Sequence, residues 1–289
     1  MVKGLDIFKE FFHDFKDQYV LIGGAACDLV LSEADLSFRA TKDLDVVLIV
    51  EALTPEFGRR FWEFVRAGGY ENRAKSTGSP QFFRFDKPKI SDFPYMIELF
   101  ARAESMLGDD KHTCRPLHLG DELSSLSAIL LNSEYYQLLM TGKTVLSDVT
   151  VLPQIYLVLF KAKAWLDLTE RKASGQQIDE KNIRKHKNDV ARLAALFTGN
   201  ETCTVPAGVL ADIRQFIEVF EKDPPDMKAL GLSGITGQDI TALLKKIYIV
   251  NSQSKCNSGA GSGIYSGKQK MIALSLGNFL LKGRRKCQT

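Results

Sequence analysis

The spacing of hydrophobic and polar positions predicts that the chain begins with alternating helices and strands. Four phenylalanines recur at helical spacing within residues 5–15, which indicates an amphipathic helix. Residues 19–22 form an apolar run that ends at two glycines, and residues 44–50 form an apolar, β-branched run typical of a buried strand. Between them, residues 25–31 have helical character and residues 36–42 form a polar connection. The expected order is helix, strand, glycine turn, helix, strand.

The pattern continues with one more helix and two more strands. Residues 55–67 carry an apolar helical stripe, and the glycine pair that follows provides a stop. Residues 81–85 and 95–100 are expected strands, separated by proline-containing turn residues. From residue 121 onward helical periodicity dominates. The chain is therefore expected to adopt an α+β fold with an α/β-like core, in which a small mixed sheet flanked by helices is followed by a helical domain.

Length and composition divide the chain into three expected parts. With 289 residues, of which 45% are hydrophobic, it can build a sizeable core and a second, smaller domain. We expect a core over residues 1–120, a helical domain that completes a cleft over 121–251, and a tail over 252–289. The tail carries seven Lys or Arg residues and no acid. Its interpretation stays open between a flexible RNA-binding arm, a peripheral helix and an atypical segment.

Charge and cysteine usage restrict the setting. The net charge of +3 is too mild to indicate nucleic acid by itself. The five cysteines are widely spaced and include no Cys-x-x-Cys pair, so neither a disulfide framework nor a zinc site is expected. Neither an amino-terminal signal segment nor an apolar run of the ~18 residues needed for a membrane span is apparent. We therefore expect a cytoplasmic protein with no membrane partner.

Two aspartates at the start of a predicted strand are the first candidate site. Asp43 and Asp45 are two residues apart, so both side chains project from the same face of the sheet. Like charges this close are costly unless a cation binds, and Mg²⁺ is a natural partner for carboxylate oxygens. The alternative is that both are exposed strand-start residues capped by Arg39 or Lys42.

Two further features strengthen the aspartate pair. Gly23-Gly24 ends the first strand, where backbone amides at the start of the next helix can approach a phosphate closely; an ordinary tight turn explains the pair equally well. Glu98 is a lone acid within an otherwise apolar strand and needs a partner there. An edge strand with alternate exposure is the simpler explanation for Glu98.

Together these residues resemble the DNA polymerase beta-like nucleotidyltransferase superfamily, and most of all its AbiEii/AbiGii-type toxin branch, over roughly residues 19–197. The resemblance implies a nucleotidyltransferase fold and two-metal phosphoryl transfer. It implies that Mg²⁺ or Mn²⁺ binds Asp43, Asp45 and Glu98, with Glu98 holding one ion or activating the acceptor hydroxyl. The residues that it places at the nucleoside triphosphate, the co-substrate, are Gly23, Gly24, Arg39 and Thr41.

A lysine-containing helix is expected to contribute to the same site. Residues 155–168 are apolar around almost the whole helix, so Lys161 and Lys163 need either an anionic partner or a route to solvent. Their spacing places them on nearly opposite sides. Lys161 precedes Ala-x-Ala and resembles the family's helix lysine, so we expect it to face the phosphates, with Lys163 in reserve.

Residues 183–193 resemble the family's motif of a basic residue followed four positions later by aspartate and an aliphatic residue. Asp189 is therefore expected to orient a basic residue or the acceptor near the metals. The alternative is a surface ion pair between Lys185 and Asp189 at i, i+4 spacing. His186 is interpreted as a satisfied histidine at the edge of the core.

The function expected from the resemblance is transfer of a nucleoside monophosphate from a nucleoside triphosphate to an acceptor hydroxyl on RNA, protein or a small molecule. A toxin of a toxin–antitoxin or phage-defence system, with an antitoxin protein as partner, is the corresponding biological role. The alternative is a catalytically silent nucleotide-binding or interaction module. A basic surface gives weak support to an RNA acceptor; its residues are Arg171, Lys172, Lys181, Arg184, Lys185 and Lys187.

Overall fold

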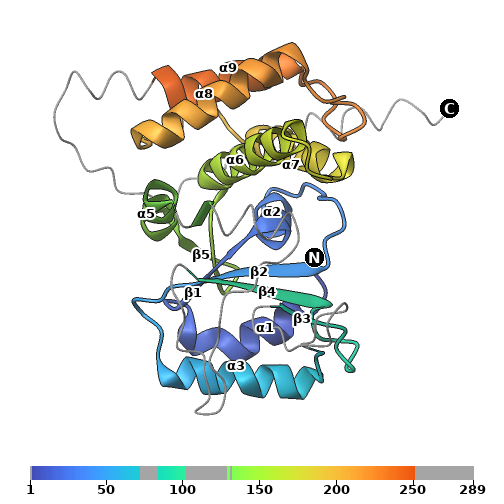
Figure 1. Cartoon of the computed structure of the whole chain (residues 1–289), viewed down its shortest axis with the longest axis vertical. Helices are drawn as coiled ribbons and strands as arrows, with labels where there is room; N and C mark the ends of the chain where they lie inside the picture. Colours follow the sequence, from blue (N-terminus) through green and yellow to red (C-terminus); the bar gives the residue numbers. More distant parts are fainter. Residues whose placement is uncertain (1, 72–83, 102–128, 131, 251–289) are drawn as a thin grey trace.

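The computed structural model describes residues 2–71, 84–101, 129–130 and 132–250 (Figure 1). Residues 81–83 of one expected strand, the start of the expected helical domain at 121–128, and the tail at 252–289 lie outside the described residues. Within them, the protein is a mixed α/β structure with one sheet flanked by helices, as the sequence predicts.

Six strands of the described chain form one mixed sheet in the order β3-β4-β2-β1-β6-β5. The strand bounds are β1 (Tyr19–Ile22), β2 (Asp43–Leu48), β3 (Arg84–Asp86), β4 (Met96–Ala101), β5 (Thr144–Leu146) and β6 (Val149–Val151). Strand β2 runs antiparallel to β1 and parallel to β4. The β1, β2 and β4 strands were predicted to within two residues at each end, because each is an apolar run that is buried.

The sheet register brings the predicted acids together. Asp45 lies opposite Ile22 of β1 on one side and opposite Glu98 of β4 on the other. Glu98 in turn lies opposite Arg84 of β3. One end of the three adjacent strands β1, β2 and β4 therefore carries the Asp45 and Glu98 carboxylates beside the turn that follows Ile22.

The β5–β6 hairpin is a difference from the prediction, because it lies within the segment expected to be helical. Strand β6 pairs in parallel with β1 and extends the sheet beyond it. The two-residue turn consists of Ser147 and Asp148, with φ of 47° and 69°. Two-residue hairpin turns with positive φ at both positions are of type I′, and glycine or asparagine usually marks them. Because neither residue is present, the turn gives no clear signal.

Helices α1 (Leu5–Phe12) and α3 (Pro55–Gly68) cover one face of the sheet, at the bottom of Figure 1. Phe12 packs against Phe57 and Phe64 of α3, with ring centroids 5.4 Å apart in both pairs. The α3 helix ends at Gly68 and is capped by Gly69, whose φ of 65° provides the predicted stop. A phenylalanine-rich layer thus supports the strands from below.

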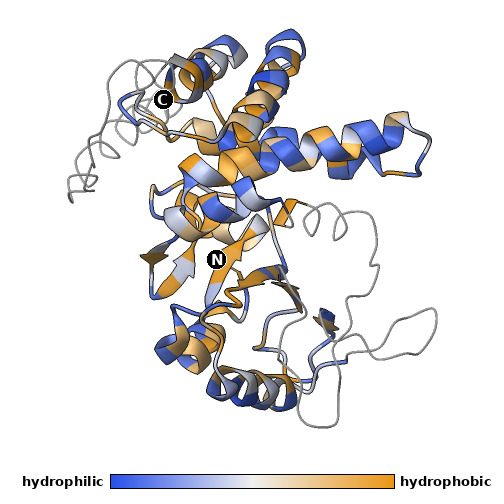
Figure 2. Cartoon of the chain, turned by 60° about the vertical axis from the view of Figure 1, so that its left-hand side comes forward, coloured by the Kyte–Doolittle hydropathy of each residue, from blue (hydrophilic) through white to orange (hydrophobic). Residues whose placement is uncertain are grey.

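The remaining α-helices of the described chain and its π-helix lie on the opposite side. Helix α2 (Gly23–Ser32) lies between the sheet and the pair formed by α6 (Gln154–Ala173) and α7 (Glu180–Ala194). Figure 2 shows hydrophobic residues concentrated on the strands and between helices, with hydrophilic residues on the outer faces. The helices outside or beside this pair are α5 (Ser133–Gly142), α8 (Ala207–Lys222), α9 (Gly237–Leu244) and the π-helix η2 (Lys245–Val250).

Helix α6 is buried over much of its circumference, as its sequence predicts. Its Trp165 packs edge-on against Phe216 of α8 at 5.5 Å, and Tyr248 donates a hydrogen bond to the Ile155 carbonyl at 2.5 Å. None of the described helices combines the length and the apolar character that a membrane span needs.

Candidate active site

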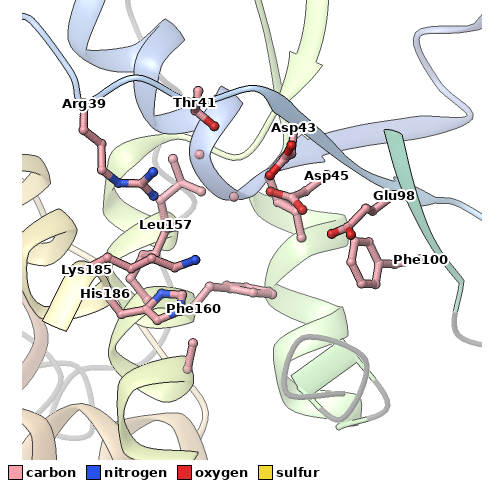
Figure 3. A pocket seen from close by; sticks show the side chains of 15 residues that line it. Arg39, Thr41, Asp43, Asp45, Glu98, Phe100, Leu157, Phe160, Lys185 and His186 are labelled. Atoms are coloured by element: carbon pink, nitrogen blue, oxygen red, sulfur yellow. The ribbon is translucent and has the colours of Figure 1, made fainter. Parts of the chain in front are cut away.

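A pocket lies where the sheet end meets α6 and α7 (Figure 3). Its cavity volume is about 120 Å³, which is below the ~300 to 1,000 Å³ of typical small-molecule sites, and the pocket opens to solvent at its mouth. Eight of the ten predicted site residues line it, and they are Gly23, Gly24, Arg39, Thr41, Asp43, Asp45, Glu98 and Lys161. The structure thus brings together residues that lie up to 138 positions apart in the sequence, from Gly23 to Lys161.

The glycine pair leaves room for side chains on the neighbouring segments. Gly23 has a φ of 66°, and a Cβ there would lie 1.7 Å from the Asp45 Oδ2. A Cβ on Gly24 would lie 2.5 Å from the Thr41 Oγ1. Residue 23 therefore needs glycine for both its backbone conformation and its space. The backbone N–H of Gly24 also donates a hydrogen bond to Asp45.

The Asp43 and Asp45 carboxylates stand side by side at the pocket wall, as their spacing predicts (Figure 3). Burial raises the pKa of Asp45 to about 6, and the charge of Asp43 adds to the rise. Lys161, the Gly24 amide and Lys185 oppose it. Two hard oxygen donors in a partly buried pocket, one of them costly to ionise, fit a divalent cation such as Mg²⁺ or Mn²⁺.

Glu98 lines the pocket but also has a cationic partner. Its Oε1 lies 3.0 Å from the Arg84 Nη2 on the neighbouring strand. Strand β4 has neighbours on both sides, so the edge-strand explanation for Glu98 is wrong. Within the described ranges, no three acidic, histidine or cysteine side chains are grouped closely enough to hold a metal ion. Of the three acids, Asp43 and Asp45 are the candidate cation ligands, whereas Glu98 is bound to Arg84.

Asp189 is fully buried and binds two basic side chains of the pocket. Its carboxylate accepts hydrogen bonds from the Arg39 Nε and Nη2 at 3.1 and 3.0 Å, and lies 3.2 Å from the Lys161 Nζ. Burial alone would raise the pKa of Asp189, but Lys161 and Arg39 hold it below its ordinary value. The alternative of a surface ion pair between Lys185 and Asp189 is wrong, because the Asp189 side chain has no exposed area.

The two lysines of α6 have different environments. Lys161 lines the pocket and is only 6% exposed, so it does not extend to solvent. Burial acts to lower the pKa of Lys161, but electrostatic interactions with Cys27, Asp189 and Asp45 outweigh it and raise the pKa. Lys163 lies outside this pocket and forms an ion pair with Asp212 of α8 at 2.9 Å.

Two adjacent residues of α7 belong to the pocket although neither was predicted as part of it. Lys185 and His186 lie across the pocket from the three acids, and Figure 3 shows the Lys185 amino group pointing toward them. Their positions four and three residues before Asp189 place all three on one helix face, a signal that the sequence offered. The interpretation of His186 as a satisfied histidine is wrong, because its buried Nδ1 has no hydrogen-bond partner among the described residues.

The predicted basic surface is partly neutralised. Lys172 forms an ion pair with Glu180, and Lys187 forms one with Asp223 at 2.6 Å. Lys185, another residue of the predicted basic surface, lines the pocket. The charge available to a polyanion on this surface is therefore smaller than the sequence indicates.

No family model, no curated protein and no solved structure matches this chain.

Proposed function

We propose that this protein is a metal-dependent nucleotidyltransferase with a nucleotidyltransferase fold, which transfers a nucleoside monophosphate from a nucleoside triphosphate to an acceptor hydroxyl. The observation that carries the proposal is one pocket with two adjacent carboxylates, Asp43 and Asp45, facing the cationic residues Lys161 and Lys185. A divalent cation bound at the carboxylates and a polyphosphate bound at the lysines satisfy both sets of charges.

The chain's own groups account for binding of the triphosphate. Lys161 and Lys185 attract its phosphate oxygens, and the pocket wall around Phe160 and Leu157 is apolar enough to strengthen these charge interactions. The Arg39 guanidinium also lines the pocket, but Asp189 holds it through two hydrogen bonds. Asp189 therefore acts as a positioning residue that fixes Arg39 and Lys161 before the ligand arrives.

In the proposed reaction the acceptor oxygen forms a bond with the α-phosphorus, pyrophosphate leaves, and the hydroxyl proton passes to a base. Mg²⁺ or Mn²⁺, when bound at Asp43 and Asp45, stabilises negative charge on the phosphate oxygens. Lys161 and Lys185 neutralise charge on the departing pyrophosphate. Glu98 lies opposite Asp45 in the sheet and is the candidate base or additional ligand once its bond to Arg84 is released.

One observation favours the catalytically silent alternative. The ion pair between Arg84 and Glu98 engages the third carboxylate. If this pair is permanent, the protein binds a nucleotide and a cation at Asp43 and Asp45 but lacks a base. The two functions therefore differ in turnover and not in nucleotide binding.

A nucleotide-incorporation assay tests the proposal. Each of the four labelled nucleoside triphosphates is incubated with the protein, Mg²⁺ or Mn²⁺, and total RNA, protein or small hydroxyl compounds as acceptors. We expect label to enter one acceptor class and activity to fall at least ~100-fold in Asp43→Ala and Asp45→Ala.

Asp92→Ala is the matched control, because Asp92 is an exposed aspartate in the turn before β4. Activity that persists unchanged in both pocket variants would refute the site. Nucleotide binding without incorporation into any acceptor would favour the silent module.

A further inference from the structure

The imidazole of His186 has an unmet hydrogen-bonding requirement in the pocket wall. The residue lines the pocket, and its Nδ1 is enclosed without a hydrogen-bond partner in the described part of the chain. Buried polar atoms in folded proteins are nearly always paired, because leaving one unpaired lowers stability. A bound ligand, an ordered water or a rotation of the ring can meet this requirement in the pocket wall.

The surroundings of His186 determine its protonation state. Burial lowers the pKa of His186 well below its ordinary value, and the positive charges of Lys161, Lys185 and Arg39 lower it further. The ring is therefore uncharged at neutral pH. An uncharged imidazole carries one N–H donor and one acceptor nitrogen, and the proton can occupy either nitrogen.

The same cations determine which ligand group approaches the ring. Lys161, Lys185 and Arg39 line the pocket together with His186, and they are the groups that attract phosphate oxygens once a cation neutralises the acids opposite them. Phosphate oxygens accept hydrogen bonds and donate none at neutral pH, so the partner that the ring offers them is its N–H. A half-turn about the Cβ–Cγ bond exchanges the enclosed Nδ1 with a ring carbon, which needs no partner, and moves a nitrogen to the opposite edge.

We propose that His186 is a substrate-binding residue whose imidazole N–H donates a hydrogen bond to a phosphate oxygen of the bound triphosphate, beside Lys161 and Lys185. This inference rests on the proposed function. It assigns His186 to the polyphosphate and not to the base or the sugar. The single N–H of His186 fixes the position of one phosphate oxygen through a directional hydrogen bond, whereas the lysines attract the phosphate through their charge.

Binding and thermal unfolding of the full chain test the assignment. The probes are ATP and inorganic tripolyphosphate, each with Mg²⁺, measured by isothermal titration calorimetry. In His186→Leu we expect both dissociation constants to rise about 10- to 100-fold, because a hydrogen bond to a charged group is lost. We expect the melting temperature without ligand to stay equal or rise, because the unpaired nitrogen is removed.

Two conservative variants identify the donor nitrogen. The amide that His186→Asn introduces reaches the Nδ1 position, and the amide that His186→Gln introduces reaches the Nε2 position. We therefore expect one of the two variants to restore binding to within a few-fold of wild type. His13→Leu is the matched control, because His13 is an exposed histidine on η1 (His13–Phe15).

The outcomes separate this inference from the proposed function. Wild-type affinity for both probes in His186→Leu would overturn the role of His186 and leave the proposed function standing. Weakening with ATP but not with tripolyphosphate would also overturn it, because the contact would then lie on the nucleoside. A wild-type protein that binds neither probe would refute both proposals.

Discussion

Arg39 and Asp189 are 150 residues apart in the sequence and form a two-point ion pair, with Nε–Oδ1 and Nη2–Oδ2 distances of 3.1 and 3.0 Å. Arg39 lies in the connection before β2, and Asp189 lies on α7. The pair therefore joins the sheet to the helical layer, and the Asp189 carboxylate also holds Lys161 at 3.2 Å. Geometry of this kind fixes the orientation of a planar guanidinium.

The first prediction concerns Asp189→Asn. Loss of the carboxylate charge leaves Lys161 and Arg39 partly buried without their shared partner, so we expect the free energy of unfolding at pH 7 to fall by about 3 to 5 kcal/mol. Urea unfolding measures this change. Asp223→Asn removes an exposed ion-pair partner, and we expect it to lower the free energy by less than ~1 kcal/mol.

The pH dependence of the same variant follows from the lowered pKa of Asp189. A carboxylate with a depressed pKa stabilises the folded state above its unfolded pKa of about 3.9, and this contribution is lost as the pH falls through the folded pKa. The difference between wild type and Asp189→Asn should therefore be full at pH 6 to 8 and shrink below about pH 4. An unchanged difference in acid would contradict the charge argument.

The second prediction concerns Asp45→Asn, which we expect to raise the free energy of unfolding, whereas Asp189→Asn lowers it. Burial and Asp43 raise the pKa of Asp45 to about 6, so the folded state resists ionisation of this carboxyl. Without divalent cations, we expect the variant to be about 1 to 3 kcal/mol more stable than wild type at pH 8, and the gain to disappear toward pH 4. Denaturant unfolding in a chelator checks both values.

Addition of Mg²⁺ should make wild type more stable than Asp45→Asn at pH 8. A cation that binds the folded protein through both carboxylates stabilises wild type more than Asp45→Asn. Equal stabilisation of the two proteins by Mg²⁺ would show that the cation binds elsewhere. Asp92→Asn is the control for a general effect of charge.

The third prediction concerns Gly23→Ala. The added Cβ would lie 1.7 Å from the Asp45 Oδ2, and the φ of 66° strains any residue with a side chain. We expect a loss of about 2 to 4 kcal/mol in the free energy of unfolding, together with loss of Mg²⁺ binding.

Gly175→Ala separates backbone strain from crowding. Gly175 has a φ of 93°, but no described atom lies within 4 Å of the position that an added Cβ would take. We expect Gly175→Ala to lower the free energy by only about 1 to 2 kcal/mol and to leave Mg²⁺ binding unchanged. If the two alanine variants behave alike, then contact with Asp45 is not what makes residue 23 a glycine.

The fourth prediction concerns Arg84→Gln. The variant removes the charge that engages Glu98 at 3.0 Å, so Glu98 becomes available to a cation. We expect Mg²⁺ affinity to increase by about threefold or more, because an additional carboxylate faces the site. Calorimetric titration with Mg²⁺ measures the change.

Glu98→Gln in the Arg84→Gln background is the control, and we expect it to abolish the gain. An Mg²⁺ affinity that Arg84→Gln leaves unchanged would mean that Glu98 serves the Arg84 ion pair alone.

The sequence was sufficient for features that depend on neighbours along the chain. Strand β1 is an apolar run, β2 and β4 are mainly apolar, and Asp43 and Asp45 share a sheet face because they are two residues apart. The β5–β6 hairpin was missed because Ser147-Asp148 lacks a glycine or asparagine at its turn.

Features that depend on which segments meet could not be predicted. The bond between Arg84 and Glu98 requires the register of β3 against β4, which the two local patterns do not contain. The choice between Lys161 and Lys163 depends on Asp212, which binds Lys163 from a distant helix. The unpaired Nδ1 of His186 is likewise a result of helix packing and not of local sequence.

The short link between β6 and α6 has a mechanical consequence for the pocket. Strand β6 ends at Val151, the Leu152 N–H still donates to the Leu21 carbonyl at 3.1 Å, and α6 starts at Gln154. The lysine-bearing helix is thus tethered to the sheet by two residues, and Arg39 and Asp189 clamp the layers a second time. A hinge-like separation of the layers would break a buried ion pair, so a ligand would have to enter and leave through the open mouth of the pocket while the two layers stay joined.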